Sequence, residues 1–100
     1  MPGTHDLDWF AARTDTAPES LRLRAENYLR RTRAANDTVR LEVAGAEALH
    51  AAIEAGQHRA AALDLLAADA LITLALLAQS EADPARLGDV ARGMRLRAIA

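Results

Sequence analysis

Two glutamates and two histidines form the constellation with the clearest chemical potential in this sequence. They are spaced by three or four positions: Glu47, His50, Glu54 and His58. On a helix, such spacing places the side chains on one face. Glu47-x-x-His50 is the spacing with which carboxylate-bridged di-iron bundles direct a glutamate and a histidine at one metal. Because one chain offers too few ligands, this interpretation requires a dimeric, ferritin-like site that binds a divalent metal such as iron.

The alternative interpretation of the same residues needs no metal. In it, His50 is partly buried and bonded to a neighbouring glutamate, while the other side chains stay in solvent. Gly56 is expected to end the helix before His58, and the chain has no second Glu-x-x-His. Short motifs of this kind also arise often by chance. We therefore favour a protein without a cofactor and keep the metal site as a rival hypothesis.

Asp64 and Asp69 stand out because they lie within the most apolar stretch of the chain. A buried carboxylate is costly unless it is paired or hydrogen-bonded. Five positions apart on a helix, the two side chains point about 140° away from each other, so they cannot act as an acid–base pair. We expect both to be buried polar groups, each paired with an arginine such as Arg59. The alternative is a polar spot within an interface or a cleft.

All twelve basic residues are arginines, and a charged stripe runs between positions 22 and 40. It consists of Arg22, Glu26, Arg30, Arg33, Asp37 and Arg40. Glu26 precedes Arg30 by four residues, the favourable orientation for a helical ion pair, which predicts a salt-bridged face in solvent. The alternative is a surface that binds phosphate. Since the net charge is −2 and the pI is about 5.9, we expect no nucleic-acid partner.

The residues required for other kinds of catalysis are missing from the sequence. There is no cysteine, which excludes disulfides and thiolate metal sites. Ser20 and Ser80 are the only serines, and neither has a histidine within sequence reach. No glycine-rich phosphate loop is present. We therefore expect a protein that is not an enzyme.

The composition favours helices over strands. Hydrophobic residues make up 51% of the chain, and alanine, the strongest helix former, dominates them. The β-branched and aromatic residues that strands need are scarce. We predict one helical domain over residues 16–100, preceded by an irregular N-terminal arm over residues 1–15. Trp9 and Phe10 are expected to anchor this arm on the body of the protein.

An apolar stripe in steps of three or four residues predicts a helix from Thr16 to Gly56. Thr16 and Glu19 match a capping box at its start, and Gly56 suits its end. As one helix it would be about 58 Å long, whereas a compact 100-residue domain has a radius of gyration of about 13 Å. We therefore favour a break near Asn36–Thr38, with Asp37 capping a new helix, over a continuous helix.

Residues 58–80 predict a central helix that is apolar on every side, and such a helix must be covered over most of its surface. Burying one leucine is worth about 1.5–3 kcal/mol, so several exposed leucines would remove much of a small domain's stability. The remaining helical segments are too short to cover it all. The predicted subunit interface consists of Leu63, Leu66, Ala70, Leu74 and Leu77. A last helix is expected to start at Asp83-Pro84.

The segment from Ala55 to Ile72 resembles the second helix of HEPN-type bundles. It joins a glycine turn at Gly56 to an alanine-rich helix containing Ala-Asp-Ala-Leu. Over about residues 25–80, the resemblance implies a small helical dimer from a family with many ribonucleases of toxin–antitoxin and defence systems. The family's cleavage motif is an arginine followed four to six residues later by a histidine, late in the domain. No histidine follows His58, so the resemblance implies a non-catalytic member.

The sequence also favours a soluble protein. Its N-terminal residues lack the basic and apolar regions of a secretion signal. Asp64 and Asp69 interrupt the stretch that comes nearest to the roughly 18 uncharged residues of a membrane span. We expect a cytoplasmic protein without a membrane partner, and its alanine and arginine content is typical of a high-GC bacterial genome.

These patterns together predict an all-α protein, an oligomeric up-and-down bundle of three or four helices. The function they favour is a regulatory or scaffolding subunit that acts as a helical homodimer in protein–protein interaction. The alternatives are a dimeric metal-binding protein, a HEPN-type toxin–antitoxin or defence component, and a nucleic-acid-binding protein that uses its arginine faces.

Overall fold

The computed structural model describes residues 2–34, 36–56 and 58–99, with side chains described for residues 8–34, 36–56 and 58–97. Within these ranges the chain forms helices and no strand, which confirms the predicted all-α class. The elements are α1 (Pro2–Arg13), α2 (Glu19–Arg31), α3 (Asp37–Ala55), α4 (Arg59–Ala82), the 3₁₀ turn η1 (Pro84–Arg86) and α5 (Leu87–Ile99). The described residues thus form five α-helices, where the sequence predicts three or four.

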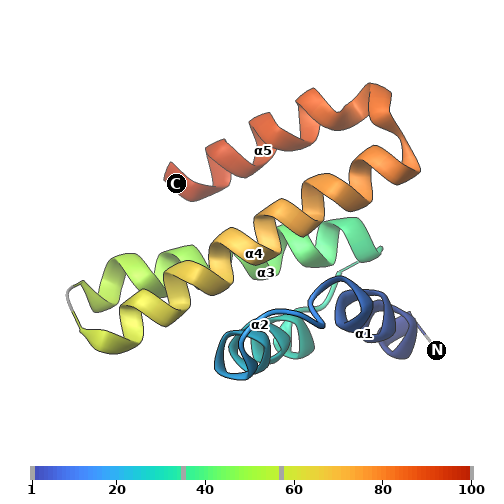
Figure 1. Ribbon diagram of the computed structural model, residues 1–100. Helices are drawn as coiled ribbons and strands as arrows, with labels where there is room; N and C mark the ends of the chain where they lie inside the picture. Colours follow the sequence, from blue (N-terminus) through green and yellow to red (C-terminus); the bar gives the residue numbers. More distant parts are fainter. Residues whose placement is uncertain (1, 35, 57, 100) are drawn as a thin grey trace.

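Helices α3 and α4 form an antiparallel hairpin at the centre of the fold (Figure 1). Gly56 ends α3 at φ +64°, a conformation that residues with a side chain rarely adopt. Small residues line the seam between the two helices, and a Cβ added to Gly45 would lie only 2.8 Å from Cγ1 of Ile72. The other small residues buried in these helices include Ala44, Ala48, Ala52, Ala61, Ala68 and Ala75.

The break predicted near Asn36–Thr38 is confirmed, because α2 ends at Arg31 and α3 begins at Asp37. The new helix is capped by Asn36, whose side-chain oxygen accepts a hydrogen bond from the backbone N–H of Val39 at 2.9 Å. Asp37 itself is therefore the first helical residue and not the cap. The capping box predicted at Thr16 is wrong, since α2 starts after Pro18 without a side-chain cap.

The N-terminal segment is helical where the sequence predicts an irregular arm, because α1 covers Pro2–Arg13. Its predicted anchor is confirmed: Phe10 is completely buried in the core, and Trp9 packs against the same cluster. Arg13 lies 4.6 Å from the centre of the Trp9 ring and forms an ion pair with Glu81 of α4 at 3.1 Å. The arm is thus a packed helix and part of the folded body.

The last helix starts where the sequence predicts. The carboxylate of Asp83 accepts a hydrogen bond from the N–H of Ala85 at 3.2 Å, and Pro84 opens η1. From there α5 runs back along the α3–α4 hairpin (Figure 1). It is attached by the buried Met94 and by an ion pair between Arg97 and Glu42 of α3.

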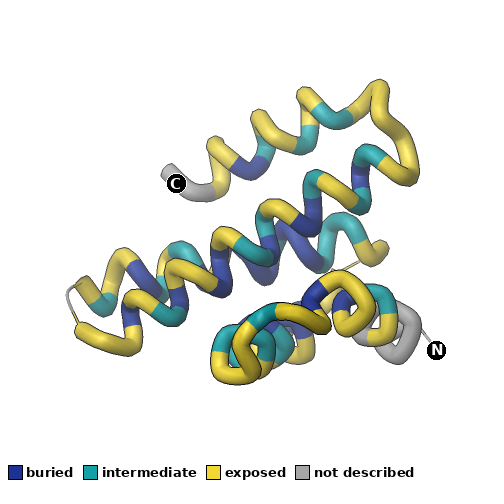
Figure 2. The backbone as a smooth tube through the Cα atoms, viewed as in Figure 1, coloured by how far each residue is buried: buried dark blue, intermediate teal, exposed yellow. Residues whose placement is uncertain are grey.

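The molecule has a radius of gyration of 12.9 Å, the value expected for one compact domain of this length. Buried residues concentrate where α3 and α4 meet and where α2 packs on them, while the outward side of α4 remains open (Figure 2). Helix α4 is also long and apolar enough to cross a membrane by length and composition, although Asp64 and Asp69 interrupt it. Only 39% of its most apolar 18-residue window is buried inside the chain.

Candidate interaction surface

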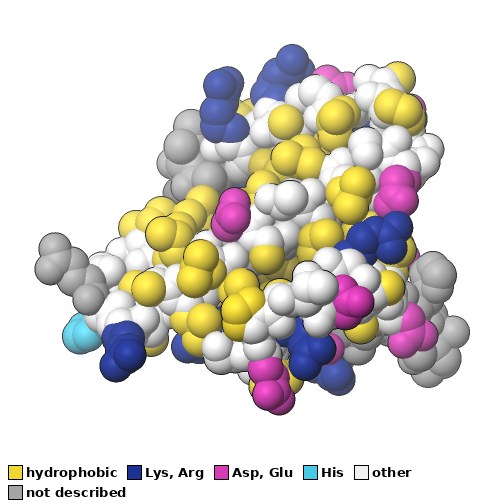
Figure 3. Space-filling view, in the orientation of Figure 1, with side chains coloured by type: hydrophobic (Ala, Val, Ile, Leu, Met, Phe, Trp, Pro, Cys, Tyr) yellow, Lys and Arg dark blue, Asp and Glu magenta, His cyan; other side chains and the backbone are white. Residues whose placement is uncertain are grey.

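One side of α4 faces away from the other helices and carries large apolar side chains. Leu65, Leu66 and Leu77 are 53%, 52% and 39% exposed. Helical periodicity places them in one stripe, which we call the α4 face. It consists of Ala62, Leu65, Leu66, Asp69, Thr73, Leu76, Leu77 and Ser80. Figure 3 shows hydrophobic side chains gathered over α4 on the side turned to the viewer.

An apolar hollow of about 460 Å³ adjoins one end of the α4 face, between the end of α3 and the start of α4. Leu65 forms one wall and Ile53, which is 64% exposed, lies on the α3 side. The other lining residues are Ala52, Gly56, His58, Ala61 and Ala62. The hollow therefore continues the apolar surface from α4 onto α3.

The structure corrects part of the predicted interface. Leu66 and Leu77 are exposed as an interface within a dimer requires, whereas Leu74 is buried among the chain's own helices. Leu63 and Ala70 are half-buried at the borders of the α4 face. Leu65 and Ile53 were missed, because a helix that is apolar all round gives no periodic signal of which side its own chain covers.

The two aspartates of α4 have opposite environments. Asp64 is buried, as predicted, and accepts a hydrogen bond from the Tyr28 hydroxyl at 2.9 Å. Its ion-pair partner is Arg24, whose Nε lies 3.4 Å from the Asp64 Oδ1, and not Arg59. The prediction for Asp69 is wrong, since this side chain is exposed in the middle of the α4 face.

Tyr28 shows the electrostatic effect of this pairing. Burial, followed by the hydrogen bond and the negative charge of Asp64, raises the pKa of the Tyr28 hydroxyl. Arg31 lies 4.8 Å from the centre of the Tyr28 ring. The network fixes α2 against α4 through contacts among its own side chains.

The structure does not bring the four predicted metal ligands together. Glu47, His50, Glu54 and His58 are all exposed, and His58 lies beyond the turn that ends α3. His50 Nε2 lies 3.2 Å from the carbonyl oxygen of Arg97 in α5. Among the residues described, no group of three or more His, Asp or Glu side chains is close enough to hold a metal ion.

The charged stripe predicted on the first helix is divided by the break after α2. No ion pair joins Glu26 and Arg30 in the described part of the chain, whereas Asp37 and Arg40 of the same stripe both have partners. Arg40 instead donates its Nε–H to the carbonyl oxygen of Leu29 at 2.9 Å, which ties α3 to the end of α2. Arg40 therefore helps to hold α3 against the end of α2.

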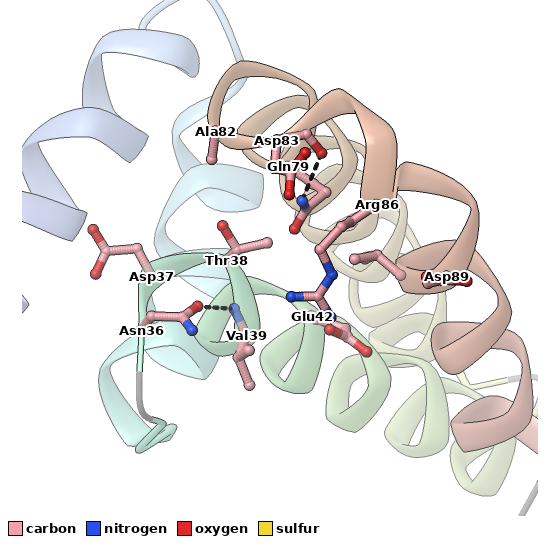
Figure 4. Close-up of a pocket in the computed structure, with 11 residues that line it drawn as sticks. Asn36, Asp37, Thr38, Val39, Glu42, Gln79, Ala82, Asp83, Arg86 and Asp89 are labelled. Carbon is pink, nitrogen blue, oxygen red and sulfur yellow. Dashed lines mark hydrogen bonds between the residues drawn. The ribbon is translucent and has the colours of Figure 1, made fainter.

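A second hollow, of about 700 Å³, lies between α3, the end of α4 and the start of α5 (Figure 4). Arg86 extends into it from η1, and four carboxylates line it. Each carboxylate already has a partner: Glu42 pairs with Arg97, Asp89 with Arg92, Asp83 caps η1, and Asp37 is also engaged. This hollow therefore presents no free base or ligand set, and the α4 face remains the strongest candidate site.

Comparisons of the chain with protein families, characterised proteins and solved structures give no match. The resemblance to HEPN-type bundles therefore stays a prediction.

Proposed function

We propose that this chain is a non-catalytic interaction subunit that assembles as a helical homodimer through the α4 face. The observation that carries the proposal is the exposure of three leucines on one side of its most apolar helix. Moving a leucine from full exposure to full burial is worth about 1.5–3 kcal/mol, and roughly half of that remains for these half-exposed side chains, which favours binding of a second copy. In a symmetric dimer, each of these leucines is buried in both subunits.

Asp69 favours a protein partner over a lipid one for the α4 face. Helix α4 has the length and composition of a membrane span, but Asp69 lies near its middle on the exposed side. A carboxylate facing the centre of a bilayer costs about 2.5–3.5 kcal/mol, whereas a protein surface can supply it with a hydrogen-bond donor. The opposite side of α4 is engaged through Asp64 with Tyr28 and Arg24 of α2. We therefore propose a soluble protein and keep the cytoplasm as its proposed location.

The proposal is tested by Leu66→Glu in sedimentation equilibrium. The change removes an apolar contact and places a charge at the interface in both subunits, so we expect the dimer Kd to rise at least about 100-fold. Leu23→Glu is the matched control, because Leu23 lies on α2 and is 49% exposed, almost the same as Leu66. The control should keep the Kd of the unaltered chain. Equal effects of the two changes, or no effect of Leu66→Glu, would speak against the α4 face.

A further inference from the structure

The residues of the α4 face are arranged almost symmetrically about Leu71, which lies near the middle of the helix. Leu66 and Leu76 are equally far from Leu71 in the sequence, as are Leu65 and Leu77. The remaining pairs at equal distance are Asp69 with Thr73 and Ala62 with Ser80. Leucine thus matches leucine, the carboxylate matches a hydroxyl, and a small residue matches a small residue.

This symmetry has a consequence for how two copies of α4 can pack. In an antiparallel twofold contact centred at Leu71, each residue of one helix faces the residue at equal distance on the other side of the centre. The Thr73 hydroxyl of each copy then donates to the Asp69 carboxylate of the other copy. Each Asp69 carboxylate therefore accepts one hydrogen bond, which makes two related bonds in the dimer, while the leucines pack on leucines.

Other arrangements of the same face are less favourable. A parallel contact places Asp69 of one copy next to Asp69 of the other, which brings two like charges together. An antiparallel contact can be shifted by one turn in either direction. One shift places Asp69 of one copy next to Asp69 of the other, and the opposite shift places it next to Leu77 of the other copy. Both shifts leave a carboxylate unpaired or opposed at the interface, and such a group is costly. The centred antiparallel arrangement pairs it without sacrificing any leucine contact.

The apolar hollow beside Leu65 fits the same arrangement. Leu65 of one copy faces Leu77 of the other, and Leu65 lines the hollow that Ile53 extends onto α3. The partner's Leu77 side chain can enter there as a knob into a hole. The hollow is lined mainly by apolar and small residues, which suits a leucine and not a charged group.

We infer that a second copy of this chain covers the α4 face in an antiparallel twofold contact centred at Leu71, with Asp69 paired to Thr73 of the other copy. The inference rests on the proposed homodimer and specifies its geometry. It is distinct from dimer formation itself, since other registers would bury the same leucines.

Because the chain contains no cysteine, single introduced cysteines can map the contact. Leu66→Cys and Leu76→Cys are prepared as separate proteins, mixed at equal concentration and oxidised in air with a copper catalyst. In the centred arrangement the two positions face each other. Position 66 and its own copy are about 15 Å apart along the axis, too far for a disulfide, which needs Cα atoms within about 7 Å. The mixture should therefore give at least about tenfold more disulfide-linked dimer than either protein alone.

A second pair of cysteine variants tests the same register at other positions, so that the conclusion does not depend on a single pair of substitutions. Leu65→Cys mixed with Leu77→Cys should cross-link in the same way, and each alone should not. Leu23→Cys on α2 is the control for random collisions and should cross-link with none of them.

The outcomes separate the register from the dimer. Two results would overturn the register and leave the proposed function standing. One is efficient cross-linking of Leu66→Cys with itself; the other is a dimer in sedimentation without cross-linking in either mixture. A chain that sediments as a monomer would overturn both.

Discussion

Asp64 and Asp69 show at the level of single residues how the environment decides what a carboxylate does. Asp64 is buried and has two partners, the Tyr28 hydroxyl and the Arg24 guanidinium, which lower the free-energy cost of placing a charge in the core. Asp69 is exposed and in the isolated chain needs no partner. Covering Asp69 with another surface costs free energy unless that surface supplies a hydrogen-bond donor to the carboxylate. Asp69 therefore favours binding of surfaces that carry such a donor.

The Tyr28 hydroxyl provides a test of the buried network through pH. A phenol whose pKa is raised by folding binds its proton more tightly in the folded state. Its stabilisation is therefore fully present below the unfolded pKa of about 10 and is lost as pH rises through the folded pKa. The chain has one tyrosine and no lysine or cysteine, so Tyr28 is the side chain that titrates in this range.

We expect the free energy of unfolding to fall as the pH rises above about 10 in the unaltered chain, and this alkaline loss to be absent in Tyr28→Phe. At neutral pH the variant should be less stable by about 1–3 kcal/mol, because Asp64 loses a hydrogen-bond donor. Urea unfolding followed by circular dichroism between pH 8 and 11 measures both. The same alkaline loss in the two proteins would show that Tyr28 is not its source.

The sequence predicts that Asp64 is buried and paired with an arginine, but it does not identify Arg24 or Tyr28. Both lie on another helix, and their contact with Asp64 depends on how α2 crosses α4. The sequence also assigns Asp69 to the core. In a helix whose apolar residues cover every side, spacing alone does not show which side the rest of the chain leaves open.

At the level of elements, the α3–α4 hairpin depends on a seam of small side chains. At Gly45 the helices approach closely, because a Cβ added there would lie 2.8 Å from the Ile72 side chain and 3.3 Å from its backbone nitrogen. Backbone cannot move away as easily as the end of a flexible side chain. The close approach of the two helices is therefore built around this glycine.

Gly45→Ala should destabilise the fold by about 1–3 kcal/mol through overpacking, even though alanine favours a helix. Gly88→Ala on α5 is the control, because no atom lies within 4 Å of its added Cβ. That change should stabilise the chain by up to about 1 kcal/mol. Thermal and urea unfolding of the two variants measure the difference. Stabilisation by both changes would show that α3 and α4 do not approach as closely as described.

Most elements follow from the sequence, and the exceptions have physical reasons. Turn chemistry places the break after α2, the glycine that ends α3 and the start of η1. Helix α1 was missed because its apolar residues at helical spacing begin only at Leu7, near the middle of the helix. Pro2 in its first turn and the spacing of Leu7 and Phe10 are the signals that favour a helix there.

At the level of the whole molecule, one chain has too few helices to enclose α4. Helices α2, α3 and α5 pack around part of it, and α1 adds Phe10 to the core. Leu65, Leu66 and Leu77 remain exposed outside this arrangement, while Leu76 of the α4 face is half-buried against the core. The sequence predicts this shortage of cover from hydrophobicity and length. It does not show which side of α4 stays open, and the register proposed for a second copy depends on that side.

The claim that a second copy covers the α4 face is tested most directly by sedimentation equilibrium of the unaltered chain over a wide dilution series. We expect a mass that rises from 10.7 kDa toward twice that value as concentration increases, described by a single monomer–dimer equilibrium. A mass that stays at 10.7 kDa at the highest soluble concentration would contradict it.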